Sequence, residues 1–167
     1  RLSEWVREWQ TAGEREVVAA SFDFVICCFV LSALPPHLHA AGLANLRRLV
    51  KPGGHLLVRD YGVYDAAMLR AKADAVVTPR LHRRGDGTLA YYFELGQMRE
   101  MLAGAGLHAG DGDAHYCRVL TRNRGRGVEM RRVWVNATAQ RPREGDGAEA
   151  AGLACHDDAA AGAGAAR

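Results

Sequence analysis

Apolar side chains gather in two short runs that flank a segment of helical period. Residues 22–31 (FDFVICCFVL) are almost all apolar and rich in β-branched and aromatic types, which is typical of a central strand covered on both faces. Within residues 37–50 the apolar positions recur at i, i+3 and i+7, which predicts an amphipathic helix. Residues 55–61 (HLLVRDY) predict the next strand. Because crossover connections are right-handed, residues 22–61 should form a βαβ unit with parallel strands.

The later elements are predicted from caps, turns and periodicity. Asp65 is placed to cap a helix at about residues 66–77, and Gly85, Asp86 and Gly87 indicate a hairpin turn. Leu95, Met98 and Leu102 define a further helix, which Gly104 and Gly106 end. Two strands follow at about 114–121 and 128–137, and the short turn between them makes them antiparallel.

This order of elements predicts an α/β fold with a doubly wound, Rossmann-like sheet, mostly parallel, with an antiparallel pair at its carboxyl-terminal edge. The 167 residues suffice for one domain. We expect an irregular lead-in at 1–21, the folded domain at 22–142, and a disordered tail rich in Ala, Gly and acidic residues at 143–167. No apolar run approaches the length of a membrane span.

Charge and cysteine usage narrow the choice of partners. Residues 59–143 hold 15 basic and 9 acidic side chains, whereas residues 144–167 hold 1 and 5. A basic region of this kind suits a polyanion-binding domain. The four cysteines and the His37–His39 pair lack the spacing of a metal site, so we expect no metal. Cysteines without a disulfide framework fit a reducing compartment.

Ligands of open α/β sheets bind outside the carboxyl ends of the strands. Residues 28–32 and 59–61 lie at two such ends and should face one crevice. For Cys28 and Phe29 the alternative is plain core packing. For Arg59, Asp60 and Tyr61 the alternative is an internal ion pair or a network that anchors a loop, because buried charges need partners.

Several motifs occur together and in order along residues 22–142. They are FVLSA (29–33), LVKPGG (49–54), VRDYG followed by YD (58–65), RGDGT (84–88) and RVW (132–134). With these motifs the chain resembles the METTL-type tRNA N(3)-methylcytidine methyltransferases, of the class I S-adenosylmethionine-dependent superfamily. The resemblance implies methylation of cytidine N3 in the anticodon loop of tRNA, with S-adenosyl-L-methionine as cofactor. It also implies a cytoplasmic protein that works with an accessory partner such as an aminoacyl-tRNA synthetase.

On this resemblance the candidate residues take roles. Asp60 would stabilise the charge that develops on the cytosine ring, Arg59 would orient Asp60, and Tyr61 or Tyr64 would stack on the base. Cys28 and Phe29 would contact the cofactor. The candidate RNA contacts are Tyr64, Arg70, Lys72, Arg83, Arg84 and Arg124, with Arg122 and Arg126 beside the last.

The chain also departs from the family pattern. We find no glycine-rich turn after a first strand and no acidic residue for the ribose hydroxyls, so we expect the fold to be incomplete at its amino terminus. The chain alone should then bind S-adenosylmethionine weakly. Two alternatives remain: a class I methyltransferase acting on a small molecule, and a truncated, inactive fragment that binds RNA or a partner.

Overall fold

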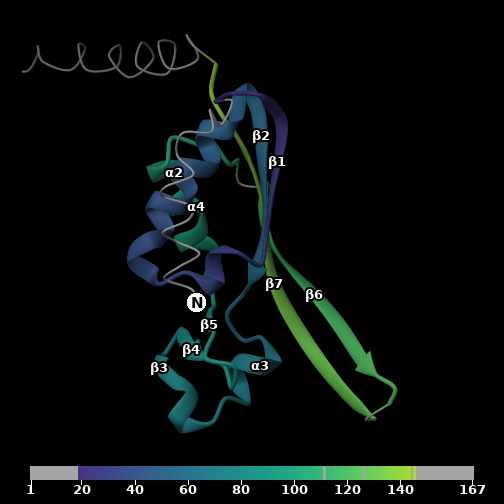
Figure 1. The fold of residues 1–167 in the computed structure, drawn as a ribbon. Helices are drawn as coiled ribbons and strands as arrows, with labels where there is room; N and C mark the ends of the chain where they lie inside the picture. The colour runs from purple at the N-terminus through teal and green to yellow at the C-terminus, as the bar shows by residue number, and fades with distance from the viewer. Residues whose placement is uncertain (1–18, 111, 126, 144, 146–167) are drawn as a thin grey trace, which may run out of the picture.

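The main sheet of the molecule has four strands. The computed structural model describes residues 19–110, 112–125, 127–143 and 145, so most of the predicted lead-in and tail lies outside the described residues. The strands run in the order β1 (Phe22–Cys28), β2 (Val50–Tyr61), β7 (Val128–Gln140) and β6 (Ala114–Asn123), as Figure 1 shows.

The predicted βαβ unit is confirmed. β1 and β2 pair in parallel, and α2 (His39–Leu49) connects them after two short 3-10 helices at Leu31–Ala33 and Pro36–Leu38. β1 ends at Cys28, three residues earlier than predicted, because Phe29 takes a left-handed backbone conformation (φ 54°) that turns the chain out of the strand. β2 begins earlier than predicted, because residues 50–54 already belong to it; Gly53 has a positive φ (81°), and the pairing with β1 shifts register between Phe22 and Phe24.

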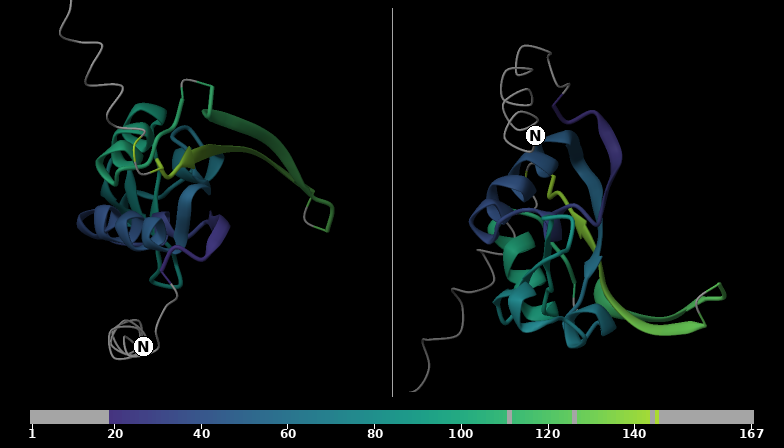
Figure 2. Two further views of the ribbon diagram at one scale, coloured as in Figure 1. Left: turned by 90° about the horizontal axis from the view of Figure 1, so that it is seen from above. Right: turned by 60° about the horizontal axis from the view of Figure 1, so that its bottom comes forward.

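Both longer helices lie on one face of the main sheet (Figures 1 and 2). α2 and α4 (Leu95–Gly104) pack there on a core that includes Leu56, Val58 and Val135. Among the described residues, β1 has a single neighbouring strand, and its Phe24 and Ile26 are 66% and 73% exposed on the other face. The prediction that β1 is a central strand covered on both faces is therefore wrong for the described part of the chain.

The segment after β2 differs from the prediction. Asp65 caps α3 as predicted, but α3 spans only Ala66–Leu69 rather than a helix to residue 77. A 3-10 turn (Ala73–Ala75) and β3 (Val76–Thr78) replace its later turns. The exposed residues beyond α3 offer no apolar face to bury, and β-branched Val76 and Val77 favour a strand.

β3 belongs to a small antiparallel sheet with β4 (Leu81–Arg83) and β5 (Leu89–Tyr91). The predicted turn joins β4 to β5, with Asp86 accepting hydrogen bonds from the amide and hydroxyl of Thr88. The predicted helix at Leu95 and the antiparallel strand pair are also confirmed.

β6 and β7 extend beyond the sheet. β2 pairs with β7 only between Trp134 and Gln140, while β6 accompanies β7 as far as Val128. Residues 118–123 of β6 and 128–133 of β7 therefore form a two-stranded arm that projects from the body of the molecule (Figures 1 and 2). The sequence from residue 118 to residue 133 holds six arginines and one carboxylate.

Candidate active site and adjoining basic pocket

The carboxyl ends of β1 and β2 meet, as the topology predicts. Cys28 pairs with Arg59 in the parallel register, and the amide of Phe29 donates to the carbonyl of Arg59 at 2.8 Å. The candidate cofactor residues Cys28 and Phe29 are thus brought beside the candidate catalytic residues Arg59 and Tyr61. Cys28 is exposed there, whereas Cys27 points into the core, where burial raises the pKa of its thiol to about 11.

An aromatic cluster lies at this edge of the sheet. The ring of Phe29 lies 4.9 Å from that of Tyr61 and 5.6 Å, edge-on, from that of Trp134. Tyr61 and Trp134 are register partners on β2 and β7, so they share one face of the sheet. A positive φ in a bulky residue such as Phe29 is uncommon and tends to mark functional sites.

Guanidinium groups cover these rings. Arg84 and Arg132 lie over the ring of Tyr61 at 5.1 and 5.4 Å from its centroid. Arg59 lies over Trp134 at 5.3 Å and donates to the side-chain oxygen of Asn136 at 2.8 Å. We call Phe29, Arg59, Tyr61, Arg84, Arg132 and Trp134 the aromatic–arginine cluster. Alternating cations and rings suit a nucleic acid, since the rings stack on bases while arginine binds phosphate.

Asp60 lies on the opposite face, within the core. Its carboxylate is fully buried and accepts hydrogen bonds from the amides of Ser32 at 3.0 Å and Tyr61 at 2.9 Å. Burial raises the pKa of this carboxyl, and the hydrogen bonds partly oppose that rise. The expectation that Arg59 orients Asp60 is wrong, because successive residues of a strand point to opposite faces. The alternative of an internal Arg59–Asp60 ion pair is excluded for the same reason, whereas the hydrogen bond from Ser32 agrees with the other alternative, a network that anchors a loop.

The predicted RNA contacts fall into two groups. Arg84 belongs to the aromatic–arginine cluster, and Tyr64 and Arg70 line a pocket beside it. Lys72, Arg83 and Arg124 are exposed on the segment after α3, on β4 and on the β6–β7 turn, and none of them lines that pocket.

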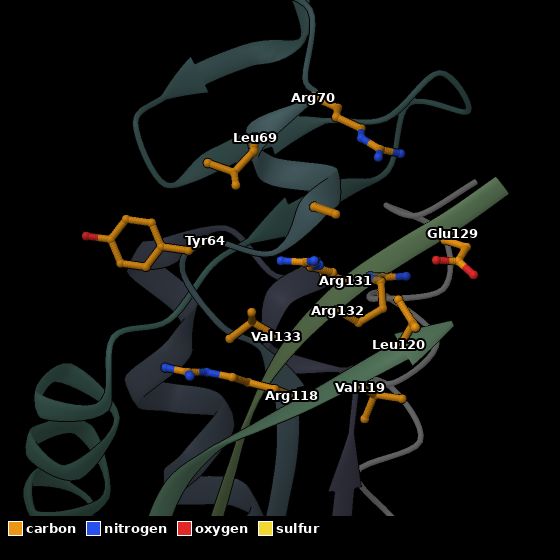
Figure 3. Close-up of a pocket in the computed structure, with 11 residues that line it drawn as sticks. Tyr64, Leu69, Arg70, Arg118, Val119, Leu120, Glu129, Arg131, Arg132 and Val133 are labelled. Carbon is orange, nitrogen blue, oxygen red and sulfur yellow. The ribbon is translucent and has the colours of Figure 1, made fainter. Parts of the chain in front are cut away.

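The pocket lies between α3 and the arm (Figure 3). Its volume is about 630 Å³. Arginines from both sides enter its lining, together with the exposed ring of Tyr64. The lining residues are Tyr64, Ala66, Leu69, Arg70, Arg118, Val119, Leu120, Glu129, Arg131, Arg132 and Val133.

Sequence reasoning missed Arg118, Arg131 and Arg132 as site residues. The two predicted strands at 114–121 and 128–137 already contained these arginines. Which other segment they face is apparent only from the position of the arm beside α3. Arg132 and Trp134 did belong to the RVW motif, which was the one available signal.

Other kinds of site find no support in the described part of the chain. It contains no group of three or more His, Cys, Asp or Glu side chains able to hold a metal ion. None of its helices has the length and apolar character needed to cross a membrane.

Comparison with known proteins identifies relatives. A family model described as a methyltransferase domain matches residues 10–58. The chain is 39% identical over 134 residues to the tRNA N(3)-methylcytidine methyltransferase Mettl2 of Drosophila melanogaster, covering 80% of this chain and 39% of that protein. It is 38% identical to human METTL2B, covering 75% of this chain and 33% of that protein. The tRNA(Thr) (cytosine(32)-N(3))-methyltransferase of Saccharomyces cerevisiae is 34% identical, with coverages of 74% and 19%. The chain thus spans well under half the length of these relatives.

Solved structures agree on the fold. A SAM-dependent methyltransferase from Methanosarcina mazei matches with a TM-score of 0.57 at 16% identity, covering 79% of this chain and 65% of that one. The 1,6-didemethyltoxoflavin-N1-methyltransferase of Burkholderia thailandensis matches with a TM-score of 0.51 at 20% identity, with coverages of 83% and 56%. The chain therefore has the Rossmann-like fold of the S-adenosylmethionine-dependent methyltransferases and is homologous, over about three quarters of its length, to the tRNA N(3)-cytidine methyltransferases.

Proposed function

We propose that this chain acts in the S-adenosylmethionine-dependent methylation of cytidine N3 in the anticodon loop of tRNA. The observation that carries the proposal is the position of Tyr61. Its ring lies at the carboxyl end of β2, beside Phe29 and under the guanidinium groups of Arg84 and Arg132. Homology to tRNA N(3)-cytidine methyltransferases supports the choice of substrate.

The cofactor would lie against the end of β1. Cys28 and Val30 are exposed there on either side of Phe29, and together they offer an apolar surface that fits the adenine ring. Neither nearby carboxylate is free for the ribose hydroxyls, because Asp60 is buried and Asp65 is bonded to Arg132. These residues therefore fit one part of S-adenosylmethionine. When bound, the cofactor supplies a methyl group on a positively charged sulfur.

The chemistry at cytosine requires positioning rather than a base. N3 of neutral cytosine carries a free lone pair, so no proton must leave before the methyl group is transferred. Watson–Crick pairing hides N3, so the base must be presented unstacked from its neighbours. The exposed Arg84 side chain would move from the Tyr61 ring to an adjoining phosphate, and the Tyr61 ring would then stack on the extruded base.

Asp60 would serve as a positioning residue. Its carboxylate fixes the amide of Tyr61 on β2 and the amide of Ser32 in the turn after β1. It thereby sets the distance between the surface proposed for the cofactor and the ring proposed for the base.

The compartment and the partner follow from the same proposal. A tRNA-modifying enzyme of this kind would work in the cytoplasm, and an aminoacyl-tRNA synthetase or other accessory protein would assist in presenting the tRNA. Co-purification of tRNA-bound protein with and without a candidate synthetase would test the second point.

The direct test is nucleoside analysis of the product. The chain is incubated with excess S-adenosylmethionine labelled on its methyl group and an anticodon stem-loop RNA with one loop cytidine. We expect 3-methylcytidine, and no label in a matched RNA whose loop cytidine is replaced by uridine. RNA binding without methyl transfer would instead support the inactive, RNA-binding alternative. Absence of both would leave the small-molecule methyltransferase, to be sought with non-polymeric acceptors.

A further inference from the structure

We propose that the pocket between α3 and the arm binds the nucleotide that neighbours the target cytidine, with arginines on its phosphate and Tyr64 on its base. This inference rests on the proposed function and assigns it a second contact surface. It adds Arg118 and Arg131 to the RNA-binding residues, neither of which the sequence motifs had indicated.

The charge of the pocket favours an anion. Two of its charged residues are already paired: Arg132 bonds to Asp65 at 2.8 Å, and Glu129 bonds to Arg122 at 2.6 Å. Within the described ranges no carboxylate lies in ion-pair distance of Arg70, Arg118 or Arg131. Three arginines from three different segments, without a carboxylate partner among the described residues, therefore line one pocket (Figure 3).

The exposed ring of Tyr64 favours a nucleotide over a simple anion. Tyr64 is 72% exposed and has a positive φ of 66°, a conformation that a tyrosine adopts only when its surroundings impose it. Its two neighbours are buried, and the amide of Val63 donates to the carbonyl of Phe93 at 3.1 Å. The backbone is thus anchored on both sides while the ring faces solvent at the rim, which is the arrangement of a stacking platform.

The location of the pocket indicates which nucleotide it takes. Arg132 lines the pocket and also lies over Tyr61, the residue proposed to stack on the target base. The amide of Gly62 donates to the carbonyl of Val133 at 2.9 Å, which joins the same two regions through the backbone. An RNA strand whose target base stacks on Tyr61 would therefore continue into the pocket. A phosphopeptide has no base to place on Tyr61, so it would not need a pocket that adjoins this ring.

The test is fluorescence anisotropy with a short labelled single-stranded RNA that contains one cytidine, titrated at several salt concentrations. The variants are the double change Arg118→Ala with Arg131→Ala, and separately Tyr64→Ala. Arg48→Ala is the matched control, since Arg48 is an exposed arginine on α2, outside both surfaces. Thermal unfolding of every variant checks that the fold is kept.

For RNA binding, the slope of log K against log salt concentration should fall in magnitude by about 0.7 for each phosphate contact that the double variant loses. Arg48→Ala should leave this slope unchanged. Tyr64→Ala should weaken RNA binding about tenfold but leave binding of inorganic polyphosphate unchanged, because polyphosphate has no base to stack. An unchanged salt slope in the double variant overturns the assignment. Equal losses for RNA and polyphosphate in Tyr64→Ala overturn the stacking role, and tighter binding of a phosphopeptide than of RNA overturns the choice of ligand.

Failure of this inference is distinguishable from failure of the proposed function. If the wild-type chain binds RNA through the pocket but forms no 3-methylcytidine, the proposed function is wrong. If it forms 3-methylcytidine and the double variant does so with an unchanged KM for RNA, the pocket assignment alone is wrong.

Discussion

The carboxylate of Asp65 bonds to Nε of Arg132 at 2.8 Å, joining the cap of α3 to the base of the arm. The same carboxylate accepts from the amides of Val133 at 2.9 Å and Ala67 at 2.8 Å. Asp65 is fully buried, and the Arg132 side chain is 19% exposed. A single side chain therefore caps a helix, pairs a charge and holds a strand at the junction between the aromatic–arginine cluster and the pocket.

Asp65→Ala should destabilise the fold by about 3 kcal/mol, because it leaves the partly buried Arg132 guanidinium without its partner and removes the cap of α3. Urea unfolding would measure the loss. Asp65→Asn keeps one side-chain acceptor and should therefore lose clearly less unfolding free energy than Asp65→Ala. If both variants unfold at the wild-type urea concentration, the junction does not depend on this carboxylate.

His39 should make stability depend on pH. It is buried against Tyr91 and Phe93, and burial lowers its pKa from the ordinary 6.5. The unfolded chain then takes up a proton at a higher pH than the folded one. The stabilisation is thus fully present above about pH 6.5 and is lost as the pH falls through the folded-state pKa.

Melting temperatures of wild type and His39→Gln between pH 7.5 and 5 would check this. The wild type should lose more stability than the variant as the pH falls. Asp60 interacts electrostatically with His39 and also contributes to the pH dependence of stability. Because its pKa is raised, its contribution has the opposite sign and grows as the pH falls. Both proteins contain Asp60, so this contribution cancels when their curves are compared. Parallel curves for the two proteins would contradict the assignment.

The adjacent cysteines should differ in reactivity. Cys28 is exposed, while the raised pKa and burial of Cys27 keep its thiol protonated and inaccessible at neutral pH. Iodoacetamide should therefore label Cys28 and spare Cys27, as fragment mass spectra would show. If the end of β1 receives the cofactor, excess S-adenosylmethionine should slow the labelling of Cys28 and not that of Cys117. Equal rates with and without the cofactor would argue against that placement.

The local elements of this fold were largely predictable from sequence, because each rests on short-range chemistry. The turns at Gly87 and Gly106 need positive φ, and glycine stands at both positions. Asp65 was recognised as a cap, whereas the length of α3 was not, because a cap predicts where a helix begins and tertiary packing decides how far it continues.

The site was less predictable, because it depends on which face of a strand a residue occupies. Arg59, Asp60 and Tyr61 were grouped by their adjacency in sequence, yet Asp60 faces the core and the other two face the aromatic–arginine cluster. The contacts of Tyr61 with Arg132 and Phe29 come from segments distant in sequence. No local pattern encodes them, since they arise from strand register.

The final prediction separates two roles for Asp60. Its two oxygens accept amide hydrogens from Ser32 and Tyr61, so Asp60→Asn would place an amide NH₂ against one of those donors inside the core. A buried donor left unsatisfied costs about 1–3 kcal/mol, so the variant should melt several degrees lower and bind RNA less well.

Arg84→Ala is the contrasting change. Arg84 is exposed over Tyr61, so its removal should weaken RNA binding and reduce the salt dependence by about one bound phosphate, while leaving the melting temperature unchanged. Melting temperature, RNA affinity and single-turnover rate of both variants would be compared. If Asp60→Asn melts and binds RNA like the wild type but transfers the methyl group more slowly by about 3 kcal/mol, the carboxylate acts on the developing charge of the cytosine and is more than an anchor for the turn after β1.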